Sequence, residues 1–283
     1  MTSSQSGFCS DGAIVLPADS ELTPPAGPGV TVPSVARGYD YLLGGKDNFA
    51  VDRQAVRMLL QVAPEAPTTA KANRAFGMRA VRYIARQGVR QFIDLGSGIP
   101  TTPVPIHDTV RAVHSDARVV YVDFDPVVVA HGNALRSAHS GLATILADIR
   151  RPQHILNHPD LSQQIDFGQP VGVVIFSVLG VIDDADDPVG IMAQFRDRMA
   201  SGSYLGLSHL SARSAENVKE HSRMISDQTG FPQVQFRSDA EVLRFFDGFH
   251  LVEPGLVEVT QWHPDELAPE MTLKLVGAVG RKP

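Results

Sequence analysis

The chain has 283 residues, of which 43% are hydrophobic and 20% charged, a composition typical of a soluble globular protein. Its 25 basic and 31 acidic residues give a net charge of −6, which argues against nucleic acid as a partner, and no apolar run approaches the ~18 residues of a membrane span. The length and the single cysteine, Cys9, predict one large α/β domain without an internal disulfide, in a cytoplasmic protein.

Residues 1–33 are rich in Pro, Ser, Gly and Ala, which predicts a flexible leader. The next stretch, YDYLLGGKDNFAVDR at 39–53, has two glycines unsuited to a helix interior and a charged run unsuited to a strand, so it indicates a segment built for contact. From about residue 50 to 87, apolar residues recur at helical spacing. We therefore expect residues 34–88 to form a helical cap or lid, with Gly44-Gly45 as its hinge.

From residue 89 onward, short apolar runs alternate with helical or polar stretches. The five runs are 90–96, 117–125, 142–149, 171–181 and 203–210. This alternation predicts a parallel, doubly wound sheet. The last two runs, 249–259 and 271–283, are separated by a loop, which predicts closing strands of which at least one is antiparallel. Residues 89–283 are thus the predicted core.

Three of these strands are expected to end in residues suited to a nucleoside. DLGSGIP supplies Gly96 and Gly98 for a tight turn, YVDFDP supplies Asp123 for ribose hydroxyls with Phe124 for a base, and LADI supplies Asp148 and Ile149. An aspartate at a strand end is also a common helix cap, so each signal alone stays open. Thr101 stands where a dinucleotide fingerprint needs its third glycine, and the series therefore favours S-adenosylmethionine over NAD.

With these motifs the chain resembles the class I S-adenosylmethionine-dependent methyltransferases, and more narrowly an actinobacterial family long carried as a domain of unknown function. The resemblance spans roughly residues 33–283 and rests on RGYDYLLGGKDNFAVDR, ANRAF, QFIDLGSGIPT, ARVVYVDFDPVVVAH, FFDGFHLVEPGLVEV and GAVGRKP. It implies a Rossmann-like sheet of about seven strands with an N-terminal helical cap. It also implies S-adenosylmethionine as cofactor and S-adenosylhomocysteine as product.

The resemblance assigns roles to further residues. Asn48 and Arg74 are expected near the methionine carboxylate of the cofactor, and Ser97 and Ser177 complete the expected cofactor set. Tyr39, Tyr41 and Gly180 are expected to border the acceptor pocket. An alternative is that Asp47, Arg53 and Arg74 form a salt-bridged network that holds the cap to the core.

The chain departs from its family in two places. Gly180 stands where relatives commonly carry a histidine, and TTPVPIHDTV at 101–110 alters the spacing before His107. Both departures lie where substrate is expected, so substrate or reaction can differ from that of the relatives.

Methyl transfer needs mainly alignment, and a general base only for an acceptor that must lose a proton. His209, which follows the fifth predicted strand, is the candidate base because histidine titrates near neutral pH, and its alternative role is structural. The spacing of His, Asp and Glu predicts no metal site.

Three function classes follow. The first is a methyltransferase acting on a small molecule, such as a specialised metabolite. The second is a protein that binds S-adenosylmethionine without transferring its methyl group, using it in another reaction such as a cyclisation or as a sensed ligand. The third, a nicotinamide-dependent oxidoreductase, is opposed by Thr101. We expect no nucleic-acid or membrane partner, and a homodimer stays open.

Overall fold

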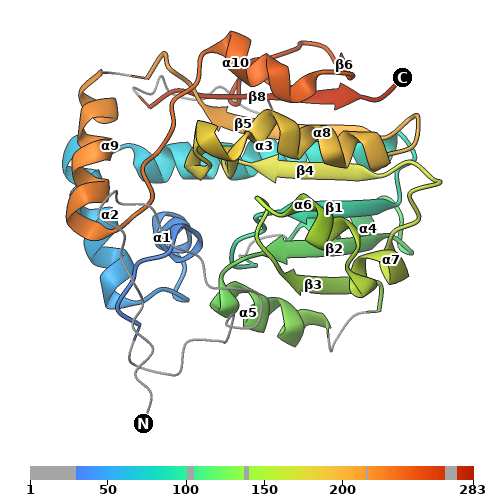
Figure 1. Ribbon diagram of the computed structural model, residues 1–283, viewed down its shortest axis with the longest axis horizontal. Coiled ribbons are helices and arrows are strands. Elements are labelled where there is room, and N and C mark those ends of the chain that lie inside the picture. Colours follow the sequence, from blue (N-terminus) through green and yellow to red (C-terminus); the bar gives the residue numbers. More distant parts are fainter. Residues whose placement is uncertain (1–29, 101–104, 137–139, 215, 265–272) are drawn as a thin grey trace.

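The computed structural model describes residues 30–100, 105–136, 140–214, 216–264 and 273–283 (Figure 1). Most of the predicted leader at 1–33 and residues 101–104 of the TTPVPIHDTV departure, Thr101 included, lie outside the described residues.

The described chain forms an eight-stranded sheet in the order β3-β2-β1-β4-β5-β8-β6, with β7 paired to β8. Strands β1 to β5 are parallel, and β8 runs antiparallel to β5, β6 and β7. The expected doubly wound sheet with antiparallel closing strands is confirmed, and the first closing segment is divided into two short strands. Their bounds are β1 (Gln91–Leu95), β2 (Arg118–Asp123), β3 (Leu142–Leu146), β4 (Gly172–Phe176), β5 (Tyr204–Leu210), β6 (His250–Leu251), β7 (Val257–Glu258) and β8 (Leu275–Arg281).

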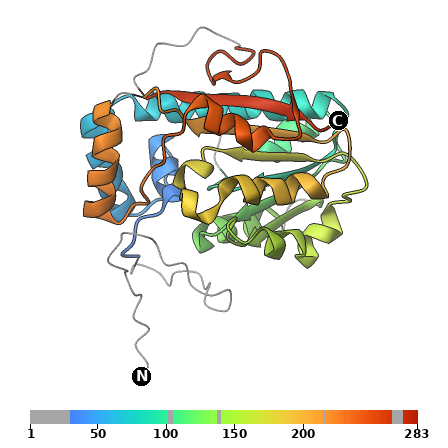
Figure 2. The ribbon, with the colours of Figure 1, turned by 45° about the horizontal axis from the view of Figure 1, so that its top comes forward.

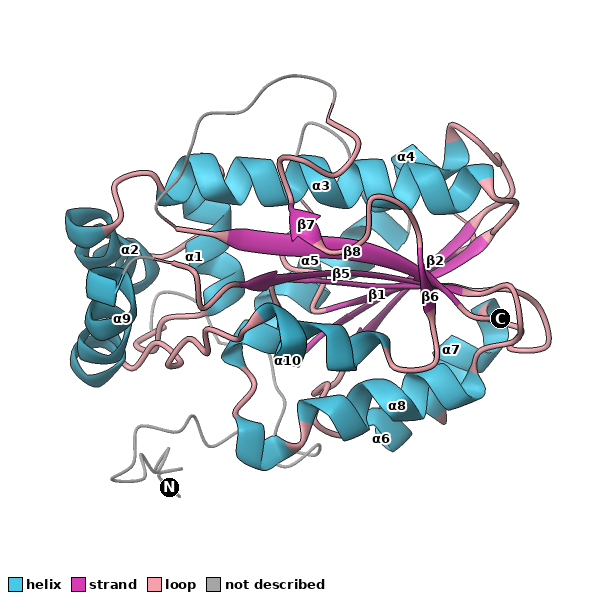
Figure 3. Cartoon of the chain, turned by 90° about the horizontal axis from the view of Figure 1, so that it is seen from above, coloured by secondary structure: helices cyan, strands magenta, loops and turns pink. Residues whose placement is uncertain are grey.

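Helices cover both faces of this sheet (Figure 3). On one face lie α3 (Ala66–Arg86) and α4 (Ile106–Arg111), and α5 (Pro126–Arg136) packs against β3. The other face carries α6 (Pro152–Leu156), α7 (Pro159–Gln164), α8 (Pro188–Arg198) and α10 (Asp239–Leu243), with the short 3-10 turns η3 (Leu179–Val181), η4 (Asp184–Asp186) and η5 (Arg244–Phe246). Each face has its own apolar core because the parallel strands are apolar on both sides.

Helix α3 shows how the pattern determines the packing. It begins with Pro67 in its first turn, and Phe76, Ala80 and Ile84 recur every fourth residue and are fully buried against the sheet. The remaining face of the helix is polar. No helix of the described chain carries an apolar stretch long enough to cross a bilayer.

Three further helices stand at the carboxyl ends of the parallel strands (Figures 1 and 2). They are α1 (Val35–Leu42), α2 (Ala50–Val62) and α9 (Glu216–Thr229), and α2 packs on both α1 and α9. The cap expected at 34–88 is therefore not one unit: α3 belongs to the sheet layer, while α9, from the later half of the chain, joins α1 and α2. This end of the sheet is where the site is found.

Candidate active site

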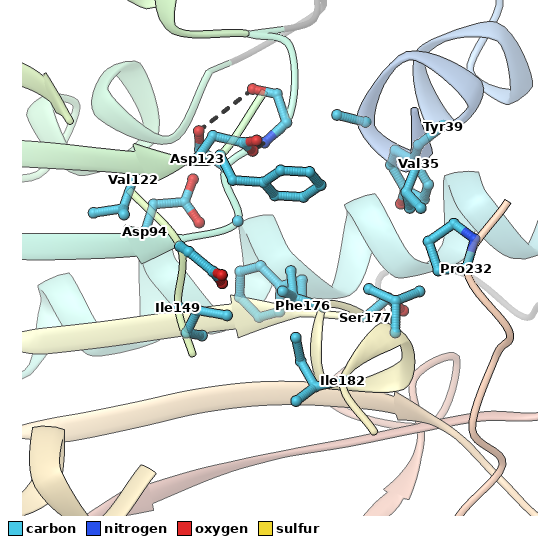
Figure 4. A pocket seen from close by; sticks show the side chains of 18 of the residues that line it. Val35, Tyr39, Asp94, Val122, Asp123, Ile149, Phe176, Ser177, Ile182 and Pro232 are labelled. Carbon is cyan, nitrogen blue, oxygen red and sulfur yellow. Dashed lines mark hydrogen bonds between the residues drawn. The ribbon is translucent and has the colours of Figure 1, made fainter. Parts of the chain in front are cut away.

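A cavity of about 310 Å³ opens at the carboxyl ends of β1 to β4, where the strand order reverses between β1 and β4. Open α/β sheets bind ligands at such a reversal. Figure 4 shows Asp94 and Asp123 on the strand side of this cavity, and Tyr39 of α1 with Pro232 on the opposite side. The cavity therefore lies between the sheet and the helices at its end.

The loop after β1 supplies the predicted glycines. Gly96 and Gly98 have φ angles of +68° and +62°, in the left-handed region that glycine enters without strain. A Cβ on Gly96 would lie 2.4 Å from a methyl carbon of Val178, so only glycine fits there. The N–H groups of Gly96 and Ser97 donate to the Val122 carbonyl at 2.8 and 3.1 Å, which fixes this loop on β2. Gly96, Ser97 and Gly98, which are predicted to bind the cofactor, all line the cavity.

Asp123 ends β2 beneath that loop. Its Oδ2 accepts from the Gly98 N–H at 2.8 Å and its Oδ1 from the Asp125 N–H at 2.9 Å. Burial raises the pKa of this carboxyl to about 6, and the backbone donors act in the opposite direction. Asp123 thus joins two loops structurally, and its carboxylate, which offers about four acceptor sites, can also accept from a ligand.

The predicted base-binding residues lie beside it. Phe124, Asp148 and Ile149 all line the cavity. Arg150 Nη2 lies 2.9 Å from Asp148 Oδ2, and the Arg150 N–H donates to Asp148 Oδ1 at 3.0 Å. Asp148 is therefore held in place by its own loop.

Two cavity residues were missed by sequence reasoning although their motifs were noted. Asp94 lies within β1, and burial raises its pKa to about 7 while the Arg74 guanidinium lowers it. Phe176 ends β4 and meets Phe76 edge-on with ring centroids 5.7 Å apart. Both line the cavity with Arg74, which was predicted. The available signal was a polar or aromatic residue near the end of an otherwise aliphatic strand.

The cavity wall is strongly acidic. It contains Arg74 and Arg150 against six aspartates, which are Asp94, Asp123, Asp148, Asp183, Asp186 and Asp227. This composition favours a ligand that carries positive charge and many hydrogen-bond donors.

The segment at 39–53 folds largely on itself. Asp40 is buried at its centre, where its Oδ2 accepts from the Asp47 N–H at 3.0 Å and from Asn48 Nδ2 at 2.7 Å. A Cβ on Gly45 would collide with the Asp40 carboxylate, which explains that glycine. Tyr39 lines the cavity, whereas Tyr41 and Asn48, predicted to contact substrate and cofactor, do not. The structure gives Asn48 a structural role, since its side-chain amide bonds to Asp40 and to the Gly45 carbonyl and so holds the turn together.

A buried ion-pair network ties this end of the chain to the sheet. Arg37 of α1 lies 2.9 Å from Asp52 of α2 through Nε and 2.7 Å from Asp125, in the β2–α5 turn, through Nη1. All three side chains are at most 5% exposed. Of the alternative network, Arg53 donates to the Asn48 carbonyl and Asp47 lies 3.8 Å from His131, and the alternative stays a prediction. Sequence reasoning missed the Arg37 network because 88 residues separate Arg37 from Asp125.

A second cavity of about 180 Å³ lies among α1, α2, α3 and α9. Gly180 lines this cavity and not the first, and a Cβ there would come no closer than 3.9 Å to its neighbours. Ser177, with a left-handed φ of 62°, lies where the two cavities meet. The six residues that line both are Val35, Tyr39, Asn73, Ser177, Val181 and Pro232.

Comparison with known proteins identifies the family. Residues 28–283 match the family described as S-adenosyl methyltransferase. The chain belongs to this family. A candidate methyltransferase from Thermobifida fusca YX is 37% identical, with a TM-score of 0.85 over 92% of this chain and 98% of its own. A DUF574 family protein from Streptomyces avermitilis is 35% identical, with a TM-score of 0.84 over 89% of this chain and 98% of its own. No curated protein matches the chain.

The S-adenosyl methyltransferase family confirms two expectations. The chain has the class I methyltransferase fold, and its enzyme class is the S-adenosylmethionine-dependent methyltransferases. Both relatives cover nearly the whole chain, in agreement with the resemblance drawn from residues 33–283.

The prediction of a catalytic base at His209 does not fit the structure. His209 is fully buried and lines neither cavity. Arg237 Nη1 lies 2.8 Å from its Nε2, and because arginine only donates, Nε2 accepts and Nδ1 donates to the Leu210 carbonyl at 2.8 Å. Burial, aided by Arg237, lowers the pKa of His209 to about 4. In this S-adenosyl methyltransferase His209 is therefore a neutral structural residue on the face of β5 that packs toward α10.

Metal ligands do not assemble at the site either. Within the described ranges, no group of three or more His, Cys, Asp or Glu side chains is placed to hold a metal ion. His107, which follows the altered spacing in TTPVPIHDTV, is buried with its Nδ1 2.7 Å from the Tyr121 hydroxyl.

Proposed function

We propose that the chain binds S-adenosylmethionine in the first cavity and transfers its methyl group to a small molecule. The observation that carries this proposal is the meeting of three strand-end motifs around one cavity: Gly96 and Gly98 after β1, Asp123 at the end of β2 and Asp148 after β3. Separately each has a structural explanation. Together they match the donors and acceptors of an adenosine.

The side chains of the cavity wall match the chemical groups of the cofactor one by one. The free lone pairs of Asp123 suit the two ribose hydroxyls, and Asp148 suits an exocyclic amine. Phe124 and Ile149 offer apolar faces to a base. Arg74 suits the methionine carboxylate, and the surplus of aspartates suits the ammonium and sulfonium groups.

The residues of the chain bind, align and exclude water. Bound S-adenosylmethionine supplies a methyl group on a sulfonium, which is already a good leaving group. The helices α1 and α9 lie at the strand ends and contribute residues to the cavity wall, so they narrow the access of solvent to a bound cofactor. Alignment in a shielded cavity can supply much of the rate without a catalytic side chain.

A second candidate function is binding of S-adenosylmethionine without methyl transfer. The observation that favours it is that the described walls of both cavities contain no histidine. An acceptor that must lose a proton would then lack the usual base.

Ligand-induced stabilisation tests the proposal directly. A ligand that binds only the folded state raises the melting temperature by mass action. We expect S-adenosylmethionine and S-adenosylhomocysteine each to raise it, with NADH as the control that does not. No shift with either sulfur ligand, or a shift with NADH alone, would contradict the proposal. Detection of a methylated product by mass spectrometry would then separate the first candidate function from the second.

A further inference from the structure

The second cavity differs chemically from the first. Its described wall contains no Asp, Glu, Lys, Arg or His side chain. It is formed mainly by aliphatic residues of four helices, including Leu42 of α1, Val56 and Leu59 of α2, Ala70 of α3 and Ile225 of α9. Such a wall stabilises a ligand through apolar contact and offers nothing to a buried charge.

We propose that this second cavity holds the methyl acceptor, and that the acceptor is an uncharged, mostly hydrocarbon molecule about the size of one substituted aromatic ring. The inference rests on the proposed function, since it takes the first cavity as the cofactor site. It adds the chemical class of the substrate.

The volume of the cavity indicates the size of the acceptor. Its volume is about 180 Å³. An apolar cavity of about 150 Å³ is sufficient for benzene, whereas drug-sized ligands occupy roughly 300–1,000 Å³. A single ring with a small substituent therefore matches this volume, whereas a large polycyclic molecule would extend beyond it.

Two polar side chains of the wall, Tyr39 and Asn73, belong to a chain of hydrogen bonds that begins at Ser208 outside the cavity. Ser208 Oγ donates to Asn73 Oδ1 at 2.6 Å, Asn73 Nδ2 donates to the Tyr39 hydroxyl at 3.1 Å, and that hydroxyl donates to the Ala70 carbonyl at 2.9 Å. This series of hydrogen bonds ends at a backbone carbonyl, so these side chains give the cavity its shape and keep little hydrogen-bonding capacity for a ligand. A charged acceptor would lose its hydration here without receiving an ionic partner.

Among its described residues, the wall also lacks a proton acceptor that works at neutral pH. Burial raises the pKa of Tyr39 to about 12, so its phenol stays neutral. The acceptor that suits this wall is therefore nucleophilic while uncharged, as in an aromatic amine or a thioether. Its lone pair forms the new bond to the methyl carbon, the carbon–sulfur bond of the donor breaks, and that electron pair stays on sulfur. A proton carried by the accepting atom leaves afterwards to water.

The junction of the two cavities places an acceptor beside the donor. Tyr39, Asn73 and Ser177 belong to both walls. Figure 4 shows Tyr39 and Ser177 on the side of the first cavity away from Asp94 and Asp123. A molecule in the second cavity would thus approach from the side opposite the strand-end aspartates.

Three probes with one ring system and different charges test this selection. Indole is neutral, tryptamine is cationic and indole-3-acetate is anionic, and each would be titrated by calorimetry into protein saturated with S-adenosylhomocysteine. We expect indole to bind at least ~10-fold more tightly than either charged probe. Equal binding of all three, tighter binding of a charged probe, or no binding of indole would overturn the inference while leaving the cofactor proposal intact. Failure of S-adenosylhomocysteine itself to bind would instead overturn the proposed function.

Neighbouring leucines of α2 provide a matched pair of variants. Leu59 and Leu60 are both half-buried, but only Leu59 lines the second cavity. Leu59→Trp should fill the cavity and abolish indole binding with S-adenosylhomocysteine affinity unchanged, whereas Leu60→Trp should retain both. Retained indole binding in Leu59→Trp would place the probe elsewhere and overturn the inference. If Leu59→Trp does not fold, the comparison of the three probes on the wild-type protein still decides.

Discussion

The two cavities share a wall but are built on opposite principles. The first is lined by six aspartates and two arginines, and its shape depends on backbone N–H groups donating to Asp123. The second is lined by aliphatic side chains, and no charged residue of the described chain faces it. The first should therefore recognise its ligand by directional bonds that depend on pH, and the second by fit and apolar area that do not.

Releasing helix α1, which lines both cavities, should have the largest effect on stability and on ligand binding. Arg37→Ala leaves Asp52 and Asp125 buried without their partner, which should cost about 3–5 kcal/mol of unfolding free energy. Because α1 carries Val35 and Tyr39 to both walls, affinity for S-adenosylhomocysteine and for indole should fall together. Denaturant unfolding and calorimetry would measure both effects.

The control for this variant is an exposed ion pair. Arg90 and Asp116 lie 2.6 Å apart with side chains 57% and 67% exposed, so Arg90→Ala should cost less than ~0.5 kcal/mol. A loss in Arg37→Ala as small as that of the control would show that the buried network does not hold α1 in place.

Substitution of Asp123 should weaken ligand binding in the first cavity and leave binding in the second unchanged. Asp123→Ala removes the acceptors for the ribose hydroxyls, an expected loss of about 2–3 kcal/mol in S-adenosylhomocysteine binding, or roughly 30- to 150-fold. Indole affinity should be unchanged, since Asp123 lines only the first cavity. Asp123→Asn should give an intermediate loss. Cofactor affinity like that of the wild type in folded Asp123→Ala would rule out a ribose anchor.

The structure also changes what is expected of the stability of this variant. A strand-end carboxylate facing a cleft would support little of the fold, but Asp123 accepts from the Gly98 and Asp125 N–H groups. Its removal should therefore cost the ligand-free protein about 1–3 kcal/mol as well. Stability alone cannot assign the role of Asp123, and the binding measurement decides.

Lowering the pH should weaken ligand binding in the first cavity and not in the second. The pKa of Asp123 is raised to about 6 in the ligand-free protein, and hydroxyl donors favour its ionised form. Ligand binding then releases a proton, so S-adenosylhomocysteine affinity should be full above pH 6 and fall by up to ~10-fold per pH unit below it. Indole affinity should be constant over the same range. A flat profile for both ligands would contradict a role for ionised Asp123, and Asp123→Asn should flatten the cofactor profile.

Removal of the Tyr39 hydroxyl should give the smallest effect, although Tyr39 belongs to both walls. Tyr39→Phe removes the hydroxyl that donates to the Ala70 carbonyl and accepts from Asn73, at a cost of about 1 kcal/mol in stability. Methyl transfer, once an acceptor is known, should persist because this phenol is not the base. Complete loss of transfer in a folded Tyr39→Phe would make the hydroxyl a catalytic group.

The sequence predicted what depends on local pattern. The apolar runs located the five parallel strands, and the residues that follow them, such as Gly98, Asp123 and Asp148, were assigned to one site because parallel strands end at one edge. The opening motif was singled out correctly as unusual. Sequence reasoning did not foresee that Asn48 bonds to the buried Asp40, which gives the motif a structural role as well.

What the sequence could not predict depends on contacts between distant elements. The ion pair of Arg37 with Asp125 and the second cavity, which needs α9 beside α2, have no local signature. His209 illustrates a different limit. Ser208 points to Asn73 of α3 while His209 points to Arg237, and alternation along β5 alone does not reveal which face borders the cavity.

The shared wall has a thermodynamic consequence. Six residues line both cavities. A ligand in one cavity that fixes the conformation of Tyr39 or Ser177 will therefore favour or hinder binding of a ligand in the other. We therefore expect binding in the two cavities to be coupled, with either sign. Because coupling free energies are reciprocal, the factor by which S-adenosylhomocysteine changes indole affinity must equal the factor by which indole changes that of S-adenosylhomocysteine. An enzyme built this way could favour an order of substrate binding without a separate regulatory site.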